Sequence, residues 1–168
     1  MDIASFNNFL VACVGASSAF LGFLLVALSL VLARTNAGTE LKFTDRRLAE
    51  SSFTALANIF FVSFIALLPN TNMGYAALIL AIFGMRSVWQ LVGRFQEMKK
   101  KEDVSEYTAD IFWIILQFLI YAAEGVYGLR IIIDPTNITN LYVMMGILMG
   151  LFGSSLVRIW ELTGIRKS

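Results

Sequence analysis

Histidine is absent from the sequence, and Cys13 is the only cysteine among its 168 residues. Without histidine, haem groups, most zinc sites and histidine-based acid–base catalysis lose the side chain that they use most often. One cysteine cannot form a disulfide within a single chain. Cys13 lies in an apolar run, where we expect a small residue that faces lipid or the bundle. We therefore expect no metal site and no cofactor.

Charged residues are also few: they make up 15% of the chain, whereas hydrophobic residues make up 58%. Soluble domains contain roughly 45–50% apolar and about 25% charged residues. The apolar excess lies in long runs, which is typical of a chain dissolved in lipid. This composition argues against a soluble enzyme, a nucleic-acid-binding protein and a disordered linker.

Five apolar stretches are each long enough to cross a membrane. The charge-free stretch between Glu50 and Arg86 is too long for one crossing. Residues 69–72 (Pro-Asn-Thr-Asn) divide it, because proline lacks a backbone donor and asparagine and threonine favour turns. Residues 134–137 (Asp-Pro-Thr-Asn) end the fourth stretch, and a helix needs about 20 residues to cross roughly 30 Å of hydrocarbon. The sequence therefore predicts an all-α integral membrane protein, a single domain over residues 1–168 with transmembrane helices at about 9–33, 48–68, 73–93, 109–133 and 141–162.

Among the segments that flank the spans, lysine and arginine occur only in alternate ones. Four basic residues lie in 34–47, four in 94–107 and three from residue 158 onward, whereas 1–8, 69–72 and 134–140 contain none. Cytoplasmic loops are enriched in basic residues, which predicts an outside N-terminus and a cytoplasmic C-terminus. The first span lacks a basic start and is longer than the apolar core of a signal peptide, so we expect it to be retained.

Polar side chains inside the predicted spans follow single helix faces. In the fourth span, the spacing of Gln117, Tyr121 and Glu124 places them on one side of a helix. Arg86 and Gln90 are one turn apart in the third span. Unpaired charged or amide groups are costly in a bilayer and usually face the bundle interior or water. We therefore select six residues as pore-lining or buried polar candidates: Asn58, Arg86, Gln90, Gln117, Tyr121 and Glu124.

Depth in the membrane predicts one specific contact. At about 1.5 Å per residue, Arg86 lies about 20 Å and Glu124 about 14 Å from the outer ends of their spans. Their opposite charges favour a pair between the third and fourth helices. Such a pair is either a charged site on a conduction path or proton relay, or a neutralising pair that fixes helix register. Arg158 lies near the end of the fifth span, and we interpret it as reaching to the interface.

Small residues recur at four-residue spacing in the first and fifth spans. The patterns are Gly15-xxx-Ala19, Ser18-xxx-Gly22 and Gly146-xxx-Gly150. This spacing lets helix backbones approach closely. It predicts tight helix packing, either within the bundle or between copies of the chain.

The first two spans carry a family resemblance. Residues 15–29, Gly-Ala-Ser-Ser-Ala-Phe-Leu-Gly-Phe-Leu-Leu-Val-Ala-Leu-Ser, resemble the opening helix of a group of small, poorly characterised bacterial membrane proteins. In that group a basic loop and a second helix ending in Ser-x-x-Ala-Leu-x-Pro follow, and residues 63–69 show this pattern here. The resemblance covers roughly residues 5–95. It implies a multi-span bundle in the bacterial cytoplasmic membrane, and it brings no catalytic residue.

Two functions remain open at the level of sequence. The first is a homo-oligomeric channel or pore for ions or small solutes, and the alternative is a non-conducting anchor or regulatory subunit for a membrane or cytoplasmic partner that binds at the basic loops. A channel needs Gln117, Glu124 or Arg86 around a symmetry axis and open to water, whereas a scaffold would bury them in pairs within each protomer. No nucleophile elbow and no phosphate-binding glycine loop occurs, so we do not expect an enzyme.

Overall fold

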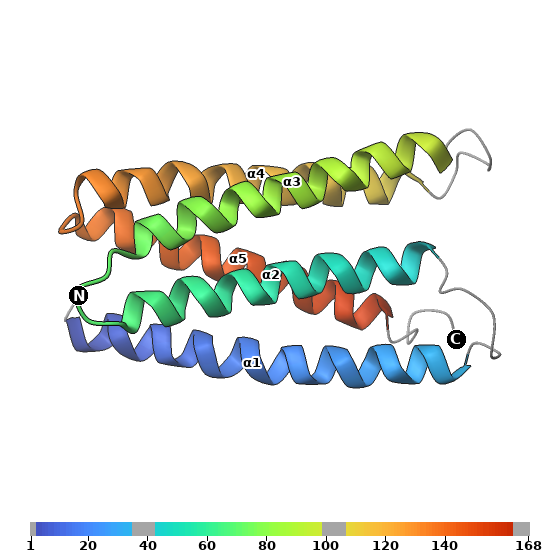
Figure 1. Ribbon diagram of the computed structural model, residues 1–168, viewed down its shortest axis with the longest axis horizontal. Coiled ribbons are helices and arrows are strands. Elements are labelled where there is room, and N and C mark those ends of the chain that lie inside the picture. The colour runs from blue at the N-terminus through green and yellow to red at the C-terminus, as the bar shows by residue number, and fades with distance from the viewer. Residues whose placement is uncertain (1–2, 35–42, 99–106, 163–168) are drawn as a thin grey trace.

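The computed structural model describes residues 3–34, 43–98 and 107–162, and these residues form five α-helices and two short turns (Figure 1). The prediction of an all-α chain with five helices is confirmed. Each predicted span lies within one helix, except that Leu68 falls just beyond the second. The helices are α1 (Ile3–Arg34), α2 (Phe43–Leu67), α3 (Met73–Met98), α4 (Tyr107–Ile133) and α5 (Ile138–Leu162).

Four of the five helices in the described part of the chain are long and apolar enough to cross a membrane. The apolar segments are Ala4–Leu30 in α1, Leu48–Leu67 in α2, Ile111–Ile133 in α4 and Ile138–Leu162 in α5. The helix outside this group is α3, whose second half contains Arg86 and Gln90. The chain therefore has the helices of a membrane protein.

Two short turns lie where the sequence predicts them. In residues 68–72, Asn70 has a φ of 61°, a left-handed conformation that asparagine tolerates better than most residues. The side chain of Asn72 then accepts a 2.8 Å hydrogen bond from the backbone nitrogen of Gly74, which caps the start of α3. In residues 134–137, Asn137 caps α5 in the same way by accepting from the nitrogen of Thr139 at 3.1 Å.

The helices run alternately in opposite directions (Figure 1). The start of α1 and both short turns lie at one end of the bundle, and the end of α5 lies at the other. The central helix is α2, which packs against α1, α3 and α5, while α4 packs against α3 and α5. Among the described residues, α1 contacts only α2 and, to a small extent, α5. The helix α1 is thus peripheral, with most of its surface exposed.

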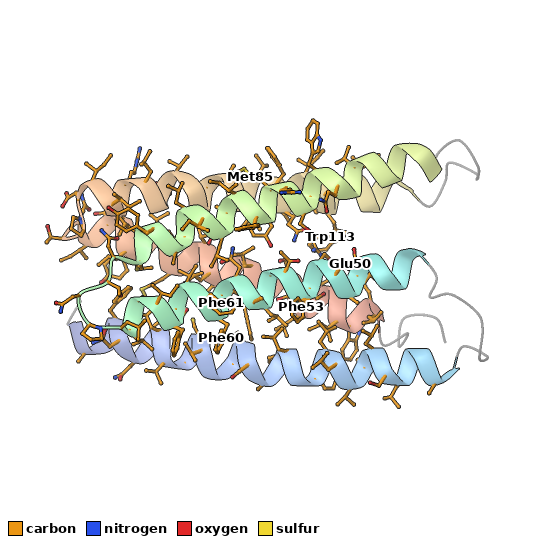
Figure 2. All side chains as sticks on the ribbon, viewed as in Figure 1. Glu50, Phe53, Phe60, Phe61, Met85 and Trp113 are labelled. Carbon is orange, nitrogen blue, oxygen red and sulfur yellow. The ribbon has the colours of Figure 1, made fainter. Side chains whose placement is uncertain are left out.

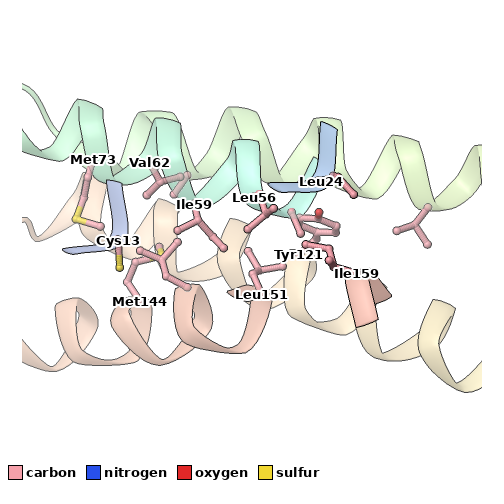
Figure 3. Packing of buried hydrophobic residues seen from close by; sticks show 14 of the residues in the cluster. Cys13, Leu24, Leu56, Ile59, Val62, Met73, Tyr121, Met144, Leu151 and Ile159 are labelled. Atoms are coloured by element: carbon pink, nitrogen blue, oxygen red, sulfur yellow. The ribbon is translucent and has the colours of Figure 1, made fainter. Parts of the chain in front are cut away.

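Large hydrophobic side chains cover the outer surface as well as the core. On α2, Phe53 and Phe61 are 50% and 47% exposed (Figure 2). Inside, Leu56 and Ile59 of α2 point toward Met144 and Leu151 of α5 (Figure 3). Apolar side chains both inside the bundle and on its outer surface match surroundings of hydrocarbon rather than water.

The α3–α4 interface depends on glycine. A Cβ atom on Gly74 would lie 2.5 Å from the backbone oxygen of Gly128. A Cβ atom on Gly84 would lie 2.5 Å from carbon atoms of the Tyr121 ring. Both distances are shorter than real side chains allow, so these helices approach closely only because the Cβ atoms are missing.

Candidate functional site

Five polar side chains from three helices meet inside the bundle and form what we call the buried polar cluster. None of them is more than 4% exposed. Its members are Asn58 on α2, Gln117, Tyr121 and Glu124 on α4, and Arg158 on α5. Buried polar groups in such number are uncommon in an apolar bundle, and they therefore mark the candidate site.

Helix geometry brings Asn58 and Glu124 to the same level. At about 1.5 Å per residue, each lies about 14 Å from the end of its helix, at Leu67 in α2 and Ile133 in α4. Both helices end at the same side of the bundle, so the two residues lie at the same height. Asn58 Nδ2 donates a 2.9 Å hydrogen bond to Glu124 Oε2.

The second contact of the cluster joins α4 to α5. Arg158 Nη1 donates a 2.8 Å hydrogen bond to Gln117 Oε1. Gln117 Nε2 in turn donates to the Tyr121 hydroxyl, at 3.4 Å. The Arg158 guanidinium also lies over the ring of Trp113, with 5.9 Å from Cζ to the ring centroid, a cation–π arrangement. The cluster is therefore a ladder of polar groups along one face of α4.

The interpretation of Arg158 as an interface-seeking side chain is wrong. Its position near the end of α5 puts a polar surface within reach, but the side chain is only 4% exposed and turns inward. The reason is local, because Gln117 and Trp113 lie one turn apart on the face of α4 next to Arg158. They give the guanidinium an acceptor and an aromatic face. Spacing along α5 alone contains no signal for these partners.

The predicted contact between Arg86 and Glu124 is also not formed. Arg86 is exposed, and within the described ranges the side-chain hydrogen-bond partner of Glu124 is Asn58. The depths of Arg86 and Glu124 agree with a contact, but their directions do not. Gly84 faces α4, and Arg86, two residues later, points about 200° away around the helix.

Of the six polar candidates, the structure brings four together and leaves two outside. Asn58, Gln117, Tyr121 and Glu124 belong to the buried polar cluster. Arg86 and Gln90 are exposed on the outer side of α3, and we call them the α3 polar face. On α5, the hydroxyls of Ser154 and Ser155 donate to the carbonyl oxygen of Leu151 in their own helix, at 2.8 and 3.0 Å.

The predicted helix-packing residues do not pack within the protomer. An added Cβ atom on Gly15, Gly22, Gly146 or Gly150 would meet nothing within 4 Å, and Ala19 is exposed. Three glycines that do pack, Gly74, Gly84 and Gly128, were not among the predicted helix-packing residues. A signal for them exists, because Gly74, Ala77, Ala81 and Gly84 follow one another at helical spacing.

No group of three or more acidic or cysteine side chains that could hold a metal occurs in residues 3–34, 43–98 and 107–162. Comparison of the chain with protein-family models, with curated proteins and with solved structures finds no match. The resemblance to small bacterial membrane proteins therefore stays a prediction.

Proposed function

We propose that this chain is a non-conducting membrane subunit that associates with a membrane or cytoplasmic partner. The observation that carries the proposal is the closure of the buried polar cluster within one protomer, where Asn58 bonds to Glu124 and Arg158 bonds to Gln117. A pore needs polar side chains in contact with water. The side chains of the cluster are at most 4% exposed, and this favours a role in holding the bundle together.

The α3 polar face supports association with a partner. Arg86 and Gln90 are exposed on α3 and point away from the bundle. Lipid chains offer neither an acceptor for the guanidinium nor a partner for the amide, whereas a polar side chain of another helix offers both. The basic loops, which the sequence predicts as a contact for a cytoplasmic partner, lie largely outside the described residues.

We place the subunit in the bacterial cytoplasmic membrane with five crossings, the N-terminus outside and the C-terminus in the cytoplasm. Three observations support this topology. The helices alternate in direction, and α3 packs between α2 and α4, two helices apolar enough to cross a membrane (Figure 1). The two turns without basic residues lie at one end of the bundle, and the helix ends that border the segments rich in lysine and arginine lie at the other.

A homo-oligomeric channel is the second candidate, and two observations favour it. Gly15, Gly22, Gly146 and Gly150 are open at the surface of the protomer, so helices of another copy could approach them closely. The α3 polar face would then line the axis, in place of the buried Gln117 and Glu124. Both candidate functions therefore assign Arg86 and Gln90 to a contact outside the protomer, with another protein or with water.

Reconstitution separates the two candidates. We expect purified protein in liposomes to pass no more potassium or chloride than empty liposomes do. A photoreactive amino acid in place of Arg86 or Gln90 should give one discrete adduct with a different protein in cells. The same probe in place of Val126, which is 53% exposed on α4, is the matched control and should give none. Ion flux that R86Q alters, with adducts only between copies of the chain, would instead establish the channel.

A further inference from the structure

Two oxygen atoms of the buried polar cluster lack a hydrogen-bond donor. They are Glu124 Oε1 and Asn58 Oδ1, both buried and without a partner among the described residues. They belong to the same two residues that the bond from Asn58 Nδ2 to Glu124 Oε2 already joins. Buried acceptors without a donor cost free energy, and such groups call for an explanation.

One proton would satisfy both oxygen atoms. An ionised carboxylate only accepts hydrogen bonds, whereas a protonated carboxyl group also has one O–H donor. A carboxylic acid facing a primary amide can form two bonds at once: the amide N–H donates to one carboxyl oxygen, and the acid O–H donates to the amide oxygen. The first of these bonds is present at 2.9 Å, and the second needs only a proton on Glu124 Oε1.

The surroundings of Glu124 favour a proton over a cation. The charged or titratable side chains of the cluster are Tyr121 on α4 itself and Arg158 on α5, and the guanidinium of Arg158 bonds to Gln117, about two turns along α4 from Glu124. From α2 the facing group is the neutral Asn58, and α3 turns Ala77, Ala81 and Gly84 toward α4. A calcium or magnesium ion would take about six oxygen ligands, more than these two residues supply.

We propose that Glu124 and Asn58 form a proton-binding site within the bundle, in which Glu124 carries a proton on Oε1 and donates it to Asn58 Oδ1. The bound proton neutralises a carboxylate that would otherwise carry an unpaired charge at about 14 Å depth. It also closes a two-bond contact between α2 and α4, two helices whose other connections run through α3 and α5. The site goes beyond the proposed function, because it holds whether the chain is a subunit or a channel.

Infrared difference spectroscopy tests the protonation state directly. At neutral pH in lipid nanodiscs, the spectrum of the wild-type protein minus that of E124Q should show the C=O stretching band of a protonated carboxylic acid. The matched control is E161Q, at a half-buried glutamate near the end of α5, which should leave that band in place. Carboxylate stretching bands in the E124Q difference spectrum would overturn the proposal.

The thermal midpoint provides a second, independent measurement. The amide introduced by E124Q can form both bonds with Asn58, so its midpoint should lie within about 4 °C of the wild-type value at neutral pH. The N58L variant loses both bonds and should unfold at a lower temperature. A failure of E124Q to fold, or an E124Q midpoint as low as that of N58L, would contradict the proposal.

Raising the pH should distinguish the two proteins further. A group that holds its proton in the folded state and releases it more readily when unfolded makes stability fall as the pH rises. The wild-type midpoint should therefore fall relative to that of E124Q as the pH is raised above neutral, since only the wild-type protein has a proton to lose at this position. Parallel pH profiles for the two proteins would show that Glu124 is not the site.

Discussion

Arg158 on α5 donates a 2.8 Å hydrogen bond to Gln117 on α4, in a region where both side chains are at most 4% exposed. An arginine side chain stays charged in proteins, so its burial requires an acceptor of fixed geometry. Gln117 supplies the acceptor, and its own amide then donates to Tyr121 at 3.4 Å. The contact fixes how α4 is rotated against α5, and through Tyr121 it reaches the glycine surface of α3.

Replacing Gln117 by leucine should destabilise the bundle strongly. The substitution removes this acceptor from the buried Arg158 guanidinium, and a hydrogen bond to a charged group contributes about 1.5–3 kcal/mol. Unfolding by denaturing detergent measures the loss. The control is Q90L, which removes an amide of the same kind from an exposed position on α3 and should change stability little. Equal effects of Q117L and Q90L would show that the bond to Arg158 does not support the fold.

Glycine substitutions should separate the packed from the open helix faces. In G84A the new methyl group would lie 2.5 Å from the Tyr121 ring, and overpacking of this kind costs about 1–3 kcal/mol. G22A on α1 is the matched control, because nothing lies within 4 Å of its added Cβ atom. Thermal unfolding in mild detergent should show a lower midpoint for G84A alone. A loss in G22A would instead indicate a neighbour of α1 from outside the protomer.

The sequence predicted the five helices well, because their signals are local. Long apolar runs define the spans, and Pro69 and Pro135 mark the two turns that the structure contains. The polar stripe of α4 was also predictable, since the spacing of Gln117, Tyr121 and Glu124 requires a shared face on any straight helix. These features depend on residues that are close together in the chain.

The partners of the polar side chains could not be predicted, because they depend on how each helix is rotated. Depth along the bilayer assigned Arg86 to Glu124, but α3 turns its glycine and alanine side toward α4 and Arg86 away from it. The same helix rotation decides that Gly74 packs against Gly128 while Gly15 does not pack in the protomer at all. Small-residue spacing is similar in α1 and α3, so it does not distinguish a face inside the protomer from one outside it.

Arg86 and Glu124 should behave as independent residues. Because Arg86 is exposed and Glu124 bonds to Asn58, R86Q should leave the free energy of unfolding nearly unchanged. The double variant R86Q/E124Q should lose the sum of the two single losses, to within about 0.3–0.5 kcal/mol, as for residues that do not touch. A double-mutant cycle in one detergent measures the coupling. A double variant clearly more stable than the sum of its parts would restore the pairing that depth alone predicts.

The number of crossings can be decided from the two ends of the chain. Five crossings put the N-terminus and the C-terminus on opposite sides of the membrane. If only the four helices that are apolar enough crossed it, both ends would lie on the same side. A reporter fused after Ser168 should therefore be active in the cytoplasm, and one fused before Met1 should be active outside it. A cysteine introduced at position 70 gives a second test of the topology. N70C in a C13S background should be labelled from the outside by a thiol reagent that does not cross the membrane. The reason is that the turn at residues 68–72 lies at the end of the bundle where α1 begins. Cytoplasmic signals from both ends would leave α3 on one side of the membrane, and its polar face would then be in contact with water rather than with a partner in the bilayer.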